Sequence, residues 1–303
     1  MKWDKKGIIF DSSGKFDWAE HSALQPTPLE FEDKIRVYFG ARDNLGVSRI
    51  GYFDCSKTDP TKIINWSKKI VLDIGENGCF DDNGVVPTTI FRVKNEVWMY
   101  YAGYQLVKKV RFLVFSGLAI SKDNGESFVR FSKAPILERT DNETLFRVIH
   151  SVVYIDGKYK VWYGGGNFFI KDEFKTYPVY DIRTMESFDG INFPKLGDVI
   201  VTNSLNEYRV GRPYVIKLNN IYYMFFGASS IENIYRLQYA TSIDMIKWDR
   251  VADDFGLEYK SNEFDSQMSA YPAVIEIEDK IWMFYNGNDY GRFGVGLALL
   301  KEF

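Results

Sequence analysis

The sequence has few of the residues that build metal centres, disulfide frameworks or membrane spans. It includes two cysteines, Cys55 and Cys79, and two histidines; the cysteines match no metal-binding spacing and are expected to be reduced, structural thiols. No apolar run approaches the roughly 20 residues that a membrane-spanning helix needs. The N-terminal segment turns polar after residues 8–10, too soon for a signal peptide. These absences predict a cytoplasmic protein without a membrane span.

A large excess of either charge is also absent. The chain carries 38 lysines and arginines against 41 aspartates and glutamates, for a net charge of −3. A nucleic-acid-binding protein usually presents a basic face, so this balance argues against a nucleic-acid partner. Apolar residues do not recur at the helical period of 3.6 over any long window, and helices are therefore expected to be few and short.

What the chain does have is a repeat. A short aromatic strand, best seen as VWMYYAG at 97–103, occurs in five near-copies. The glycines that close the copies stand 63, 61, 63 and 60 residues apart: Gly40, Gly103, Gly164, Gly227 and Gly287. Self-similarity at a nearly fixed period is typical of repeat architectures, and five copies account for all 303 residues.

Each repeat reads as four strands, because short runs of β-branched and aromatic residues alternate with Asn, Asp and Gly turns. The fifth repeat has only three strands, whereas a matching strand begins at Trp3. We therefore expect an all-β fold in which 1–303 form a single five-bladed β-propeller domain with four-stranded antiparallel blades. The N-terminal strand would complete the last blade, and such closure leaves no inner edge exposed.

The turn between the third and fourth strands carries a Ser-x-Asp signature at 121–128, 187–193 and 242–248. Aspartate and glycine are typical of tight turns, since the carboxylate accepts backbone N–H groups and glycine adopts positive φ. These segments are interpreted as turn staples, and a calcium or sugar contact is the alternative.

In a propeller, the residues before each first strand and the loops between second and third strands surround one mouth, which is the default ligand site. Cleavage of a glycosidic bond needs two carboxylates, and sugar hydroxyls bind carboxylates and arginines. The candidate catalytic carboxylates are Asp82, Asp81, Glu20 and Glu207. The candidate substrate-binding residues are His21, Arg42, Asp43, Arg212, Asp265 and Gln267. Other side chains expected at the mouth are Arg147, His150, Arg209, Asn167, Lys171, Asp172, Asp289 and Arg292.

Three stretches resemble a known family: FDDNGVVP at 80–87, Arg212-Pro213, and YNG at 285–287. The chain resembles the five-bladed glycosidases of the furanosidase superfamily, which includes glycoside hydrolase families 43, 32 and 68 and the related family 130 phosphorylases. It is most similar to uncharacterised glycosidase-like propellers associated with bacterial surface-polysaccharide synthesis. The resemblance implies a saccharide ligand and no cofactor, although a structural calcium ion in the central pore stays an open alternative.

The departures from the family pattern keep two functions open. Gln25 stands before Pro26 where family 43 enzymes carry aspartate, and Gly211 stands where they carry a later glutamate. The Glu-Asp-Pro-Arg pattern of family 130 is absent. The first hypothesis is a glycoside hydrolase, or a phosphorylase or transferase with the same site, acting on a bacterial saccharide through a carboxylate pair. The second is a non-catalytic carbohydrate-binding propeller that serves glycan biosynthesis. Oligomeric state is not predicted.

Overall fold

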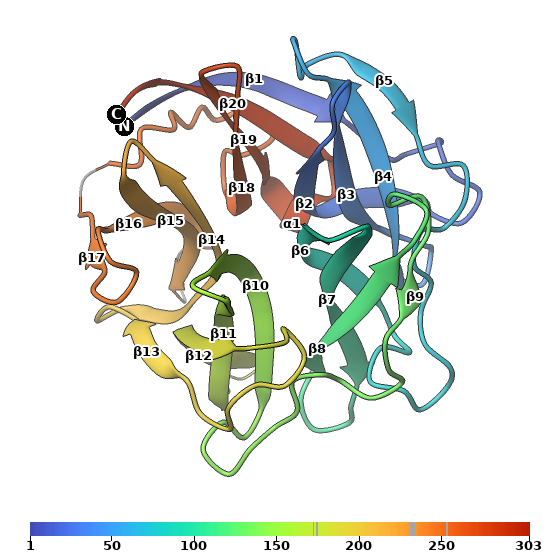
Figure 1. Cartoon of the computed structure of the whole chain (residues 1–303), viewed down its shortest axis with the longest axis vertical. Helices are drawn as coiled ribbons and strands as arrows, with labels where there is room; N and C mark the ends of the chain where they lie inside the picture. The colour runs from blue at the N-terminus through green and yellow to red at the C-terminus, as the bar shows by residue number, and fades with distance from the viewer. Residues whose placement is uncertain (172, 174, 231–233, 253) are drawn as a thin grey trace.

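Sheets of antiparallel strands make up almost all of the regular structure. The computed structural model describes every residue of the chain except 172, 174, 231–233 and 253. Figure 1 shows the sheets arranged around a common centre, with the two chain ends side by side at the periphery.

Two sheets follow each other along the first half of the chain, and each has four strands in sequence order. The first contains β2 (His21–Glu30), β3 (Lys34–Arg42), β4 (Ser48–Ser56) and β5 (Ile63–Trp66). The second contains β6 (Val85–Val93), β7 (Glu96–Leu106), β8 (Phe112–Ser121) and β9 (Val129–Arg130). All neighbouring strands in both are antiparallel, as the hairpin-like spacing of the sequence predicts.

The next two repeats form four-stranded antiparallel groups that share one larger sheet. The first group contains β10 (Phe146–Ile155), β11 (Lys158–Lys171), β12 (Thr176–Ser187) and β13 (Asp198–Val201). The second contains β14 (Glu207–Leu218), β15 (Ile221–Ser230), β16 (Arg236–Ser242) and β17 (Asp249–Arg250). A single parallel pair, Tyr180 with Arg209, links β12 to β14 and joins the two groups.

The last sheet combines both ends of the chain. It contains β18 (Ala270–Ile277), β19 (Lys280–Asn286), β20 (Val295–Glu302) and the N-terminal strand β1 (Lys2–Phe10). β1 pairs antiparallel with β20, so the predicted role of the segment from Trp3 is confirmed. A four-residue helical segment, α1 (Asn288–Gly291), lies in the connection between β19 and β20.

The first strand of each repeat lies nearest the centre (Figure 1). These inner strands contact one another in a closed cycle, from β2 to β6, β10, β14, β18 and back to β2. The aromatic second strands pack between neighbouring sheets, where side chains such as Tyr101, Trp162, Phe225 and Phe284 are fully buried. Burying a large apolar side chain contributes roughly 1.5–3 kcal/mol, so the repeated aromatic motif is scaffold.

The Ser-x-Asp turns are stapled as expected. Ser121 Oγ donates to Asp123 Oδ1 (2.6 Å) and accepts from the N–H of Gly125 (2.8 Å). The same two contacts recur in the turns at 187–190 and 242–245. Tyr38 donates its hydroxyl to the carbonyl of Gly125 (2.8 Å), so the first turn also ties two sheets together.

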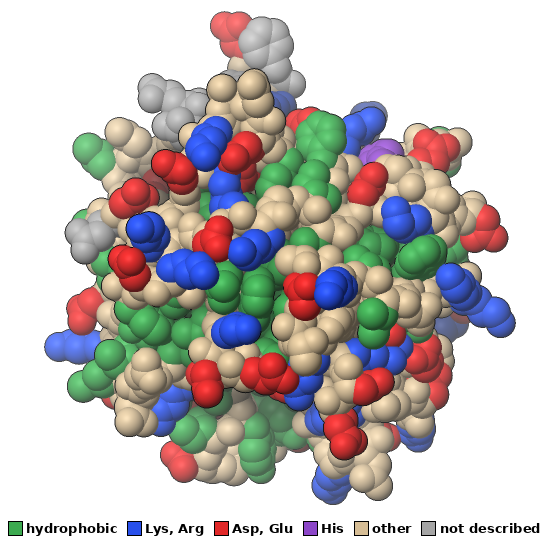
Figure 2. Space-filling model, turned by 90° about the horizontal axis from the view of Figure 1, so that it is seen from above, with side chains coloured by type: hydrophobic (Ala, Val, Ile, Leu, Met, Phe, Trp, Pro, Cys, Tyr) green, Lys and Arg blue, Asp and Glu red, His purple; other side chains and the backbone are tan. Residues whose placement is uncertain are grey.

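Basic and acidic side chains are interspersed over the face of the molecule that Figure 2 shows, in keeping with the small net charge. None of the helices in the part of the chain that the structure describes is long and apolar enough to cross a membrane.

Candidate functional site

The inner strands share a backbone irregularity at one repeat position. Each has a register shift against its second strand near the proline position of the repeat, as between Leu24 and Thr27 or between Gly211 and Tyr214. At this position Gln25, Arg212 and Tyr271 have positive φ, of 54°, 57° and 58°. Each of the three stands directly before a proline.

Positive φ is uncommon for residues other than glycine. It costs on the order of 1–3 kcal/mol and occurs mainly where a site needs a particular side-chain direction. Here the side chains of Gln25, Arg212 and Tyr271 all reach the wall of one central cavity, with a volume of about 300 Å³. That volume lies at the lower end of the range for small-molecule sites. The bulges of three different sheets therefore build one site.

The cavity wall is rich in phenol rings. Five tyrosines line it: Tyr104, Tyr180, Tyr235, Tyr271 and Tyr290. Two amide side chains, Gln25 and Asn83, add donors and acceptors, and Gln25 Oε1 is buried without a hydrogen-bond partner. Aromatic faces with a few directed polar groups are the usual composition of a specific binding pocket.

The charged groups of the wall are all of one sign. Arg42, Arg111, Arg209 and Arg212 line the cavity, and no aspartate or glutamate does so among the described residues. Nor does the described part of the chain contain any group of three or more His, Cys, Asp and Glu side chains that could hold a metal ion.

Arg212 lies at the centre of this arrangement. Its Nη1 donates to the carbonyl oxygens of Thr88 (2.6 Å) and His150 (3.3 Å), and its Nη2 donates to Thr27 Oγ1 (3.1 Å). These acceptors belong to β6, β10 and β2, so the guanidinium group ties β14 to three other inner strands. Burial lowers the pKa of Arg212 to about 10, which leaves the group charged at neutral pH.

His150 faces the same cavity and is neutral. Burial, and then the charge of Arg212, hold the pKa of His150 well below its usual range. Its Nδ1 is buried without a hydrogen-bond partner. A neutral imidazole beside a guanidinium offers an acceptor, and not a second cation, to whatever occupies the cavity.

Two of the predicted site carboxylates, Asp81 and Asp265, lie elsewhere, in matching buried clusters. Asp81 Oδ2 accepts from the Tyr101 hydroxyl (2.9 Å) and from Arg130 Nε (2.7 Å). Asp265 Oδ2 accepts from the Tyr285 hydroxyl (2.9 Å), and its Oδ1 accepts from the Lys5 amino group (2.9 Å). Both carboxylates are fully buried between a tyrosine and a cation.

A third cluster of this kind was missed by sequence reasoning. Glu143 is fully buried, accepts from the Tyr163 hydroxyl and pairs with Arg183 Nη1 (3.0 Å). In all three clusters the carboxylate precedes its tyrosine by 20 residues. That fixed spacing within the repeat was the available signal, and it marks the carboxylates as part of the repeated framework.

The other predicted catalytic carboxylates are also absent from the cavity wall. Asp82 is half-buried and accepts from the N–H of Gly78 (2.8 Å) and from Asn83 Nδ2 (2.5 Å). Glu20 is exposed on the approach to β2. Glu207 accepts a hydrogen bond from Arg250 Nη2 (2.6 Å). Burial acts to raise the pKa of Glu207, but the pairing with Arg250 outweighs burial and holds that pKa below its usual value.

Comparison with known proteins places the chain in a family. No protein-family model matches it. The chain is 33% identical over 304 residues to a Mycobacterium tuberculosis protein, strain H37Rv, described as uncharacterized protein Rv1502, and the match covers 100% of both chains. A protein of strain CDC 1551, described as uncharacterized protein MT1551, matches equally over its full length. The chain belongs to the family of Rv1502.

Solved structures identify the fold of this chain. A structure described as a glycoside hydrolase has a TM-score of 0.74 at 16% identity, covering 99% of this chain and 93% of that chain. A thermostable family-43 glycoside hydrolase has a TM-score of 0.69 at 17% identity, and the match covers 93% of this chain and 90% of that chain. A structure from work on family GH130 mannoside phosphorylases and hydrolases has a TM-score of 0.67 at 15% identity, and the match covers 94% of this chain and 85% of that chain. The chain therefore has the propeller-like fold of these glycoside hydrolases.

Within this Rv1502-family fold, the remaining predicted binding residues are dispersed. Arg42 lines the cavity together with Arg212. His21, which lies opposite Arg42 in the β2–β3 pairing, forms a hydrogen bond between its Nδ1 and Ser22 Oγ (2.7 Å). Burial, and then Arg292 and Arg42, lower the pKa of His21.

Asp43 and Gln267 make local contacts outside the cavity wall. Asp43 accepts from the N–H of Val47 (3.0 Å) and from Arg49 Nη1 (2.8 Å), which fixes the β3–β4 turn. Gln267 is exposed and donates its N–H to Asn288 Oδ1 (2.9 Å). Asp172, which was also expected at the mouth, lies outside the described residues.

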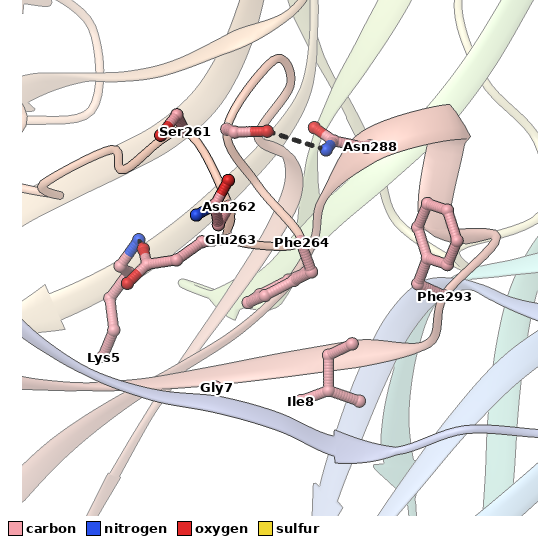
Figure 3. Close-up of a pocket in the computed structure, with 10 residues that line it drawn as sticks. Lys5, Gly7, Ile8, Ser261, Asn262, Glu263, Phe264, Asn288 and Phe293 are labelled. Atoms are coloured by element: carbon pink, nitrogen blue, oxygen red, sulfur yellow. Dashed lines mark hydrogen bonds and ion pairs between the residues drawn. The ribbon is translucent and has the colours of Figure 1, made fainter.

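A second hollow, of about 640 Å³, lies outside the ring where β1 meets the segment before β18. Figure 3 shows Lys5 and Glu263 with their charged groups together on one side of it, and Phe264, Ile8 and Phe293 on the other. Because Lys5 also binds the buried Asp265, this groove belongs to the seam that closes the last sheet.

Proposed function

We propose that this protein is a saccharide-binding member of the glycosidase-type five-bladed propellers, with 1–303 forming one domain. The closed cycle of five inner strands and the pairing of β1 with β20 support the blade count. The saccharide would occupy the central cavity, and the resemblance to glycosidase-like propellers suggests a role in bacterial surface-polysaccharide synthesis.

One observation carries the proposal. At the bulged position of the inner strands, this chain presents an amide from Gln25, a guanidinium group from Arg212 and a phenol from Tyr271. These groups bind hydroxyl and ether oxygens and stack on the faces of pyranose or furanose rings. Positive φ at these three positions costs free energy, which indicates that the placement of the three side chains serves a ligand.

The same observation favours binding over hydrolysis. Glycoside hydrolysis generally needs an acid and a base or nucleophile, two carboxyl groups roughly 5–9.5 Å apart across the bond. The described wall of the cavity provides no carboxylate. Gln25, which stands where the family 43 pattern has aspartate, ends in an amide that cannot act as an acid or a base at neutral pH.

The test is a screen that measures binding and turnover together. Arabino-, xylo-, fructo- and manno-linked oligosaccharides, with and without phosphate, would be titrated calorimetrically and then checked for released sugar. We expect binding without turnover, and we expect Tyr271→Ala to weaken that binding. Tyr154→Ala, which removes an exposed tyrosine near the end of β10 and outside the cavity wall, is the matched control. Turnover of any substrate at an enzyme-like rate would overturn the assignment.

A glycoside hydrolase is the second candidate, and the position of Asp82 favours it. Asp82 is half-buried and directly precedes Asn83, which lines the cavity. With Asp81, Glu20 or Glu207 as the partner, a change of loop conformation would have to bring a second carboxylate to the mouth. On this hypothesis Asp82→Asn abolishes turnover and leaves the melting temperature nearly unchanged, whereas unchanged turnover rejects Asp82 as the catalytic group.

A further inference from the structure

The arginines of the central cavity differ from the other buried arginines of the fold in their partners. Arg36 is nearly fully buried and binds Asp54 through Nε (2.7 Å) and Nη2 (3.0 Å). Arg183 is buried and pairs with both Asp181 and Glu143. In these cases a carboxylate offsets the cost of removing the guanidinium charge from water, as buried charges generally require.

Arg212 has no such partner among the described residues. It is 4% exposed, its acceptors are two backbone carbonyls and a hydroxyl, and its Nε has no hydrogen-bond partner. Three neutral acceptors satisfy part of the guanidinium group but leave its charge uncompensated.

Arg209 repeats the pattern at a nearby position on the same strand, β14. Its guanidinium group lies over the rings of Tyr235 (4.2 Å to the centroid) and Tyr208 (4.9 Å). Its Nη2 donates to the Tyr290 hydroxyl (3.0 Å), and its Nε is buried without a partner. The aromatic faces hold the group in place, and no carboxylate of the described cavity wall neutralises it.

From these contacts we infer that the central cavity takes an anionic saccharide, whose carboxylate or phosphate group binds Arg209 and Arg212. The inference rests on the proposed saccharide function and names its ligand class. Guanidinium groups bind planar and tetrahedral oxyanions through charge-assisted hydrogen bonds, which are about twice as strong as neutral ones. Arg42 and Arg111 extend the positive wall towards the mouth and would attract such a ligand.

The experiment compares neutral and anionic glycans on the same protein. The intact chain would be applied to an array of neutral, uronate-containing and phosphate-containing bacterial glycans. Glucuronate and inorganic phosphate would be titrated separately by calorimetry. The variants are Arg209→Gln, and Arg111→Gln at an exposed part of the wall where folding is not at risk. Arg92→Gln removes the same charge from an exposed position away from the cavity and is the control.

We expect anionic glycans to bind, and the uronate and phosphate arms to show which anion is preferred. Arg209→Gln should weaken that binding by about tenfold or more, the scale of one lost charge-assisted hydrogen bond. Arg111→Gln should weaken it less, and Arg92→Gln should leave it unchanged. Added salt should weaken binding to the unmodified protein.

The remaining outcomes separate the two proposals. If only neutral glycans bind, with equal affinity for the unmodified chain and Arg209→Gln, the anionic ligand class is wrong and the saccharide function stands. If inorganic phosphate binds but neither glucuronate nor any glycan does, the saccharide function is wrong and the cavity is a simple anion site. If nothing binds, both are wrong.

Discussion

Two sets of charged side chains in the described part of the fold differ in how their charges are compensated. Asp81, Glu143 and Asp265 each sit between a tyrosine hydroxyl and a cation, at the same phase of the repeat. Arg209 and Arg212 face the cavity with neutral partners. The first group is compensated within the fold, whereas the charges of the second are not, and we propose that a ligand compensates them.

This division predicts unequal effects at adjacent aspartates. Asp81→Asn removes the charge that Arg130 pairs with inside the fold, and should lower the free energy of unfolding by about 2–3 kcal/mol. This is less than the roughly 3–5 kcal/mol of a fully buried pair, because Arg130 is partly exposed. Asp82→Asn loses local hydrogen bonds at a half-buried site and should cost no more than about 1 kcal/mol. Urea denaturation of both variants measures the difference, and equal losses would contradict the framework role of Asp81.

His150 makes stability depend on pH. Its pKa in the folded chain is lowered by burial, so below the ordinary histidine pKa of about 6.5 the unfolded chain binds a proton that the folded chain does not. The free energy of unfolding should therefore fall as the pH drops below about 6.5.

The measurement is the urea midpoint of the unmodified chain and of His150→Gln, followed from neutral to mildly acidic pH. The variant should lose less stability on acidification, because its side chain does not titrate. The difference between the two curves isolates His150 from His21, whose pKa is also lowered and which both chains retain. Parallel curves would show that His150 does not contribute.

At the scale of elements, the strands were predictable and the bulges were not. The aromatic copies and their turns show where the strands of each repeat begin and end, because short apolar runs bounded by Asn, Asp and Gly are typical of strands and turns. The bulge at Gln25, Arg212 and Tyr271 depends on positive φ before proline, a combination that local preference disfavours. The side chains that actually reach the cavity therefore could not be assigned from spacing alone.

The same limit explains why carboxylates expected at the mouth lie elsewhere. Asp81 and Asp82 are adjacent in a turn-rich segment, and a change of one residue in register reverses the direction of a side chain. Asp81 points to Tyr101, and Asp82 caps the N–H of Gly78. Of the candidate substrate-binding residues, Arg42 and Arg212 line the described cavity, and so do His150 and Arg209, which were also expected at the mouth.

The strand β1 should contribute stability out of proportion to its length. Trp3 is 5% exposed, lies parallel to the ring of Phe255 (6.0 Å) and meets Phe225 edge-on (6.1 Å). Trp3→Ala should lower the free energy of unfolding by about 3–5 kcal/mol, the usual cost of removing a buried tryptophan. Ile8→Ala, at a position on the same strand that is 41% exposed, is the control and should cost less than about 1 kcal/mol. Similar losses for both would contradict the role of Trp3 in closing the last sheet.

At the scale of the whole molecule, the sheets enclose a central cavity whose wall combines phenols, amides and guanidinium groups. The fold is that of glycoside hydrolases, which are proteins that act on saccharides. The Rv1502-family chain keeps the architecture, but it lines the described cavity without carboxylates. We therefore propose the cavity itself as the saccharide site.

The decisive measurement is a crystal structure of the chain with a saccharide identified by the binding screen. We expect electron density for a sugar ring in the central cavity, in contact with Tyr271 and Gln25 and with an anionic group at Arg212. Density for the sugar in the groove beside Lys5, or against Asp82 and Glu20 with the cavity empty, would contradict the proposed site.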